Sequence, residues 1–154
     1  MQSPKPTLIL IHGAFHGSEC WHLVKPKLEA LSYKVVTVSL ATVGRDNPGA
    51  TYLDDVAAIH KVILPILDEG KDVIIIAHSW GGIPGVASVE GHSIAERAAK
   101  GTKGGIKAIM LIASGVILKR GATLAETNGY NSVDYMEMEV ITSSPPLSTF
   151  GSTN

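Results

Sequence analysis

Hydrophobic residues in this chain gather in four short runs, and each run predicts a β-strand. The runs are rich in Val, Ile and Leu and cover residues 8–11, 35–40, 72–77 and 107–113. An unbroken apolar run, as opposed to an alternation of apolar and polar positions, is typical of a strand buried on both faces of a parallel sheet. The pattern therefore predicts four strands, each followed by a connection.

The connecting segments show helical spacing. Helices are predicted at residues 19–31, 51–69, 80–89 and 94–99. We expect Ser18 to cap the first of them and Pro26 to kink or split it. The second should end at Gly70, and its predicted apolar stripe consists of Leu53, Val56, Ala57, His60, Ile63, Leu64 and Leu67. Alternating strands and helices predict an α/β fold, a mostly parallel sheet with helices on both faces.

The most informative stretch is D-V-I-I-I-A-H-S-W-G-G at residues 72–82. A buried strand, an abrupt turn at Ser79 and a helix-compatible segment form the context of a nucleophile elbow, in which the serine adopts a sparsely populated backbone conformation. We expect the residues two before and two after the serine to pass close together, so both should be small. Gly81 fits, whereas Ala77 stands where the G-x-S-x-G pattern has glycine. The alternative interpretation is a chance serine in a βα loop.

A second motif, H-G-A-F-H-G at residues 12–17, directly follows the first strand. We expect Gly13 and Gly17 to let the backbone turn tightly and leave peptide N–H groups free to point into a cleft. An acyl-transfer enzyme needs two such donors at the developing oxyanion, and one usually comes from the residue after the nucleophile. The expected donors are the backbone N–H groups of Ala14 and Trp80.

The remaining polar residues of the two motifs are predicted to shape these loops. His12 and His16 should hydrogen-bond the backbone, because a metal site would lack a third ligand nearby. His78, together with the glycines at 13, 17 and 81, belongs to the same loop-shaping group. No cofactor and no metal are expected.

The two motifs, in this order and each after a strand, resemble the opening of an α/β-hydrolase. The resemblance extends from H-G-A-F-H-G-S-E-C-W through L-V-K-P-K-L-E-A-L, V-V-T-V-S-L and A-H-S-W-G-G to residues 104–113. It points to small esterases that include plant methylesterases and hydroxynitrile lyases, and it covers the chain up to about Gly115. It implies Ser79 as nucleophile, Ala14 and Trp80 as the oxyanion hole and a small-molecule ester as substrate.

The family's triad runs in the order Ser, then Asp or Glu, then His. After Ser79 the only histidine is His92 and the only aspartate is Asp134, so the order is reversed. The helix after the elbow should carry His92 away from Ser79, whereas a base must come within about 3 Å. We therefore expect the N-terminal portion of a hydrolase, with an incomplete core at residues 1–116 and, at residues 117–154, the start of a lid and a poorly ordered tail.

Composition narrows the function classes. A chain of 154 residues that is 45% hydrophobic can form one domain with a core. Its net charge of -1 gives no case for nucleic acid or an anionic membrane. No apolar run approaches the roughly 20 residues that span a bilayer, and the start of the chain has no signal core. The single cysteine, Cys20, suits a reducing compartment, so a cytoplasmic location is expected.

Three function classes remain open. The first is a serine hydrolase of small esters in a longer full form; the second is a non-catalytic, hydrolase-like binding module; the third is a C–C lyase of the hydroxynitrile-lyase type. A dinucleotide-binding fold is disfavoured, because the first loop lacks G-x-G-x-x-G. The outer edge of the strand at 107–113 should expose unpaired backbone groups beside an apolar surface, which predicts possible self-association.

Overall fold

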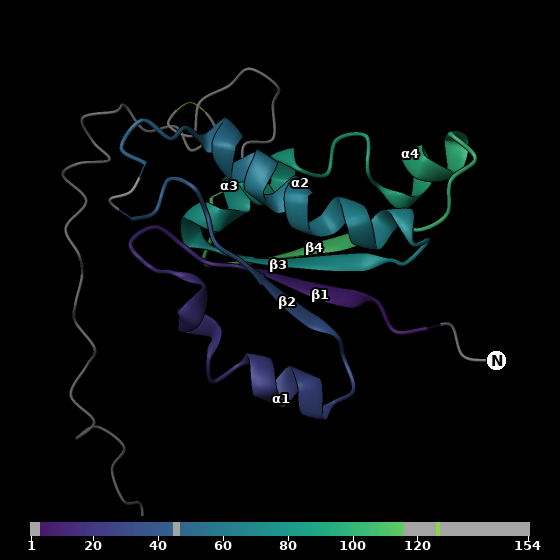
Figure 1. Ribbon diagram of the computed structural model, residues 1–154, viewed down its shortest axis with the longest axis horizontal. Helices are drawn as coiled ribbons and strands as arrows, with labels where there is room; N and C mark the ends of the chain where they lie inside the picture. The colour runs from purple at the N-terminus through teal and green to yellow at the C-terminus, as the bar shows by residue number, and fades with distance from the viewer. Residues whose placement is uncertain (1–3, 45–46, 116–125, 127–154) are drawn as a thin grey trace, which may run out of the picture.

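A four-stranded parallel sheet organises the computed structural model, which describes residues 4–44, 47–115 and 126 (Figure 1). The order of the strands across the sheet is β2-β1-β3-β4. Every neighbouring pair is parallel, so all four strands point their carboxyl ends toward the same edge. The predicted α/β class is confirmed. The strands are β1 (Thr7–Ile11), β2 (Val35–Val38), β3 (Val73–His78) and β4 (Ile106–Ile112).

Helices cover both faces of the sheet (Figure 1). The 3-10 helix η1 (Ser18–Trp21) and helix α1 (Lys25–Ala30) lie on one face; α2 (Tyr52–Asp68), α3 (Gly82–Ala87) and α4 (Ile94–Ala99) lie on the other. Burial on both sides explains why β1 is apolar without alternation, since all five of its residues are buried.

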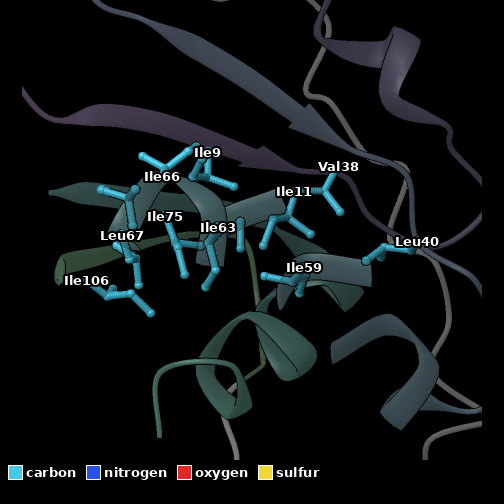
Figure 2. Packing of buried hydrophobic residues seen from close by; sticks show 12 residues of the cluster. Ile9, Ile11, Val38, Leu40, Ile59, Ile63, Ile66, Leu67, Ile75 and Ile106 are labelled. Carbon is cyan, nitrogen blue, oxygen red and sulfur yellow. The ribbon is translucent and has the colours of Figure 1, made fainter. Parts of the chain in front are cut away.

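Each face of the sheet has its own apolar cluster. On the α2 side, Ile9 and Ile75 pack with Ile59 and Ile63 of α2, and all four are fully buried (Figure 2). On the α1 side, Leu8 and Leu10 of β1 pack with Trp21 of η1. These two layers hold the sheet whose carboxyl edge carries both motifs.

The strand predicted at residues 35–40 is two residues too long. β2 ends at Val38, because the next segment leaves the sheet: the Leu40 N–H donates to the His12 Nε2 at 3.1 Å instead of to a strand. The strands predicted at 72–77 and 107–113 are each displaced by one residue from β3 and β4.

The helix predicted at residues 19–31 is in fact split into η1 and α1. Pro26 lies in the first turn of α1, where the N–H that proline lacks would have no intrahelical partner. The prediction that Ser18 is the N-cap is wrong. Gly17 takes that position, and the Ser18 hydroxyl accepts a hydrogen bond from the Ser39 Oγ at 3.1 Å.

The helix predicted at residues 80–89 likewise forms as two pieces. A 3-10 turn, η2 (Ser79–Gly81), leads directly into α3, which ends at Ala87. Helix α4 matches its predicted bounds, and Ser93 and Glu96 form a capping box at its start.

Helix α2 begins after Thr51, which forms a capping box with Asp54, and it is followed by Gly70 with φ 76°. Its predicted buried stripe is partly wrong. Leu53 is 61% exposed, and His60 lies at the margin, with its Nε2 3.0 Å from the Ser88 carbonyl oxygen. The buried face consists of Asp55, Ile59, Ile63, Ile66 and Leu67. This buried face includes the carboxylate of Asp55, which the spacing of apolar residues alone does not predict.

The predicted lid and tail at residues 117–154 lie outside the described residues, apart from Glu126. In the part of the chain that the structure describes, no helix is long and apolar enough to cross a membrane.

Candidate active site

The two sequence motifs meet at the carboxyl edge of the sheet. β1 and β3 are parallel neighbours, with Ile11 paired to Ala77. The loop at residues 12–17 follows β1, and Ser79 follows β3, so the two segments leave the sheet side by side. This juxtaposition depends on the strand order, which makes β3 a direct neighbour of β1.

Ser79 occupies a strained backbone position. Its φ is 50°, in the left-handed region that costs a non-glycine residue about 1–3 kcal/mol. The residue before it, His78, is still extended, and the two after it continue into η2. The strand therefore turns into the helix within a single residue, and that residue is the serine.

Gly13 lies directly against the elbow. A Cβ added at Gly13 would lie 3.0 Å from the Ser79 Cβ and 3.0 Å from the His78 Nδ1. Its φ is not positive, so Gly13 is needed for close approach and not for a special backbone conformation. The sharp turn of this loop is made by Phe15, which has φ 61° and is 98% exposed.

Gly81 is needed for a different reason than predicted. A Cβ added there would collide with the His12 carbonyl oxygen and lie 2.8 Å from the Ile11 Cγ2. The atoms that crowd it belong to the end of β1, not to Ala77. Ala77 faces Gly85 of α3, where an added Cβ would lie at an ordinary 3.5 Å. An alanine two residues before Ser79 therefore fits this site without displacing the elbow.

His12 ties the loop after β1 to the loop after β2. Its ring is fully buried, and its Nε2 accepts from the Leu40 N–H at 3.1 Å. The Nδ1 must therefore carry the proton and donate to the Gly13 carbonyl oxygen at 2.8 Å. Both ring nitrogens are occupied by backbone groups, so neither is free to bind a metal.

The rest of the loop is partly engaged. The Gly17 N–H is not free as expected: it donates to the Glu19 Oε1 at 3.2 Å. The exposed His16 ring lies 6.4 Å from the His78 ring, centroid to centroid.

Within residues 4–44 and 47–115, the backbone N–H groups of Ala14 and Trp80 donate to no acceptor. Among the same residues, no three His, Cys, Asp or Glu side chains gather as a metal site.

The structure adds Asp55 to the site. Its side chain is fully buried in α2 and accepts from the Trp80 Nε1 at 3.0 Å, so it contacts the residue that follows the serine. Thr42 completes the contact set through its N–H and hydroxyl. Asp55, Ile59 and Ile63 recur at a spacing of four residues, and this spacing is the signal that could have revealed a buried aspartate.

Ser114 also contacts the elbow. It follows β4, and its Oγ donates to the Ser79 carbonyl oxygen at 2.6 Å. Gly82 makes this approach possible, because an added Cβ there would collide with the Ser114 Oγ. Sequence analysis missed Ser114, although a hydroxyl residue just past the carboxyl end of a parallel strand was the available signal.

His92 lies at the far end of the sheet. Its carbonyl accepts from the Ile106 N–H at 2.8 Å, at the start of β4, whereas the residue before Ser79 pairs with Ile112 at the end of β4. Six residues of strand separate these positions, or about 20 Å. Burial, and then the nearby basic side chains of His60, Arg97 and Lys100, lower the pKa of His92. It is no base for Ser79 in this structure.

Comparison with solved structures supports the fold. An extracellular α/β-hydrolase from a Paenibacillus species superposes with a TM-score of 0.55 at 23% identity, covering 74% of this chain and 43% of that one. An α/β-hydrolase fold protein from Burkholderia ambifaria gives a TM-score of 0.51 at 19% identity, covering 80% and 42%.

Curated relatives match about half of the chain. The alpha/beta hydrolase nvfD of Aspergillus novofumigatus is 35% identical over 79 residues, which is 51% of this chain and 32% of the relative. Norfluorocurarine synthase 1 of Strychnos is 36% identical over 88 residues, covering 53% and 32%. Methylesterase 2 of Arabidopsis thaliana is 34% identical over 85 residues, covering 51% and 32%. The aligned part of the chain spans about a third of each relative's length.

A family model, described as the alpha/beta hydrolase family, matches residues 8–145. This range contains the strained serine, the loop at residues 12–17 and the four parallel strands. The chain belongs to the alpha/beta hydrolase family.

Proposed function

We propose that the chain carries the nucleophile and oxyanion hole of a serine hydrolase that acts on small esters. The proposal rests mainly on the backbone conformation of Ser79, which has φ 50° at the junction of β3 and η2. Strain of this kind persists only where surrounding structure enforces it, and it is concentrated at functional sites. Here Gly13 lies against the Ser79 side chain, and the Ser114 hydroxyl binds the Ser79 carbonyl oxygen.

Two backbone donors are available for the oxyanion. The N–H groups of Ala14 and Trp80 are free among the described residues and belong to the two segments that meet beside Ser79. In the proposed reaction they stabilise the negative oxygen that develops when the ester carbonyl becomes tetrahedral.

The proposed chemistry is acyl transfer in two steps. The Ser79 Oγ attacks the ester carbonyl carbon and loses its proton to a general base; the C–O bond then breaks, and the alcohol leaves with that proton. Water next attacks the acyl-serine carbonyl carbon and gives a proton to the base. The bond between this carbon and the Ser79 Oγ then breaks, the Oγ takes the proton back from the base, and the acid is released.

The base and its acid partner are assigned to a longer form of the protein. Two of the described histidines are excluded as that base: the ring nitrogens of His12 are held by backbone groups, and His92 lies at the far end from Ser79, near the start of β4. Asp134 lies outside the described residues. The same observation favours a second candidate for the chain by itself, a non-catalytic binding module built on the hydrolase fold.

The proposed substrate class comes from the relatives. Methylesterase 2 and methyl jasmonate esterase 1 of Vitis vinifera, the latter 30% identical over 86 residues, are named for methyl esters. We extend this class, small esters with a compact alcohol, to the present chain.

Turnover of p-nitrophenyl acetate tests the proposal. The 154-residue chain should turn over the ester weakly, because a serine without its base keeps only the roughly 10³–10⁴-fold acceleration of the oxyanion hole and binding. A form extended to the relatives' length should be strongly active, and Ser79→Ala should abolish that activity. Strong activity that survives Ser79→Ala would refute the assignment, and an inactive extended form would favour the binding module.

A further inference from the structure

We propose that Asp55 is a positioning residue that fixes the Trp80 backbone N–H as an oxyanion donor. The inference rests on the proposed function, since it assigns a task to a residue outside the motif that would otherwise be a structural aspartate. Its basis is a hydrogen-bonded unit formed by Asp55, Trp80 and Thr42, which come from α2, η2 and the loop after β2.

Asp55 is buried and accepts three hydrogen bonds. Its Oδ1 accepts from the Thr42 N–H at 2.9 Å; its Oδ2 accepts from the Thr42 Oγ1 at 2.7 Å and from the Trp80 Nε1 at 3.0 Å. Its exposed fraction is 0%. A carboxylate is acceptor-only, and three converging donors match that chemistry.

Burial without a counter-ion makes the Asp55 carboxylate dependent on the hydrogen bonds that it accepts. Among the described residues, no Lys, Arg or His forms an ion pair with Asp55. Moving a charge from water into the interior is strongly unfavourable before compensation. The aspartate and its donors therefore hold one another in a single geometry.

This geometry fixes the side chain of the residue that supplies the oxyanion donor. Trp80 is attached at its indole to α2, whose neighbouring residues Ile59 and Ile63 are fully buried. On the backbone side, Ser114 holds the Ser79 carbonyl, the other end of the peptide group that carries the Trp80 N–H. The donor thus takes its position from the rigid core and not from the loop alone.

Three variants separate positioning from stability. Asp55→Asn keeps the shape, but its amide N–H₂ faces either the Thr42 backbone N–H or the Trp80 indole N–H, so one of these donors loses its acceptor, and the Trp80 indole signal shows which one. Trp80→Phe keeps the backbone N–H and removes the indole donor. Thr42→Val is the matched control: it removes a buried hydrogen bond to the same oxygen but leaves Trp80 attached.

Two measurements on the 154-residue chain test the proposal. The first is the ¹H–¹⁵N spectrum of the two indole N–H groups, Trp21 and Trp80. The Trp80 signal should move upfield and exchange faster in Asp55→Asn and stay in place in Thr42→Val. The second is the rate of Ser79 modification by a fluorophosphonate, followed by intact mass. It should fall at least about tenfold in Asp55→Asn and Trp80→Phe and stay within about threefold in Thr42→Val.

Each outcome decides the question. Equal labelling rates in Asp55→Asn and Thr42→Val overturn the positioning role if the Trp80 indole signal has moved in Asp55→Asn. If that signal has not moved, or if Asp55→Asn does not fold, Trp80→Phe decides: labelling at the unchanged rate overturns the proposal. If the unchanged chain labels no faster than Ser79→Ala, the proposed function fails and the inference fails with it. If Ser79 of the unchanged chain reacts, and a variant whose Trp80 indole signal has moved is labelled more slowly, the result supports the proposed function and the positioning role of Asp55.

Discussion

Gly81 and Gly85 offer a sharp test of how the elbow is packed, because the same substitution should have opposite effects at two buried glycines four residues apart. A Cβ at Gly81 would collide with the His12 carbonyl oxygen and lie 2.8 Å from the Ile11 Cγ2. A Cβ at Gly85 would lie 3.5 Å from each of its nearest atoms, on Ala77, Ile109 and Ile11. Neither glycine has a positive φ, so backbone strain does not enter the comparison.

The sizes of the two effects follow from the neighbours. At Gly81 the nearest atom is a backbone oxygen that cannot rotate away, so the end of β1 must move; overpacking of this kind costs about 1–3 kcal/mol. Gly85 lies in α3, and its new methyl group would make ordinary van der Waals contacts with Ala77, Ile109 and Ile11. Replacing a glycine within a helix by alanine gains about 0.5–1 kcal/mol. The unfolding free energies of Gly81→Ala and Gly85→Ala should therefore differ by roughly 1.5–4 kcal/mol.

Urea unfolding followed by far-ultraviolet circular dichroism measures both values. Gly81→Ala should also slow the reaction of Ser79 with a fluorophosphonate, because the His12 carbonyl and the loop that carries Ala14 must shift. If Gly81→Ala is as stable as the unchanged chain, or if Gly85→Ala destabilises equally, the close approach of the elbow to the end of β1 is refuted.

Three further predictions follow from the described contacts. Burial and nearby basic groups lower the pKa of His92, so the unfolded chain binds a proton on this side chain more readily than the folded chain. The free energy of unfolding should therefore fall as the pH drops below about 6.5. His92→Gln should reduce the change in urea midpoint between about pH 8 and pH 5.5, and an equal change in both proteins contradicts this. Met110 and Ile112 are 55% and 40% exposed on β4. Among the described residues this strand has only β3 as a neighbouring strand, apart from the bridge between Ile106 and Ser93, so analytical ultracentrifugation should show self-association that Met110→Lys weakens. A strictly monomeric chain at low micromolar concentration contradicts this. Ser114→Ala removes the hydrogen bond to the Ser79 carbonyl and should cost about 0.5–1.5 kcal/mol of unfolding free energy, measured by urea titration; no change would show that the bond does not hold the elbow.

The sequence predicted the sheet because strand burial leaves a strong local pattern. β1 and β3 are apolar on both faces, and the predicted bounds are within one residue of those observed. The errors lie where tertiary contacts decide. β2 ends before Leu40 because the Leu40 N–H donates to His12. A local sequence pattern cannot identify a hydrogen-bond acceptor that lies 28 positions away. The first helix splits because Pro26 suits a first turn better than an interior.

The candidate site shows the same division. Ser79, Gly13 and Gly81 were found from local motifs, because a tight turn restricts the residue types that can form it. Asp55 was missed because its partners are separated from it in sequence, Thr42 by 13 positions and Trp80 by 25. A charged residue in a helix is ordinarily exposed, and only the assembled fold shows that three donors converge on this one.

The most direct test of the central claim is to locate the fluorophosphonate adduct. Trypsin releases residues 72–97 as one peptide, which contains Ser79, Ser88 and Ser93. Fragmentation of the labelled peptide assigns the modified hydroxyl, with Ser88 and Ser93 as internal controls in the same molecule. The proposed nucleophile requires the adduct on Ser79 alone, formed slowly and absent from Ser79→Ala. An adduct on Ser88 or Ser93, or one spread evenly over the serines of the chain, would show that the strained serine is not a nucleophile.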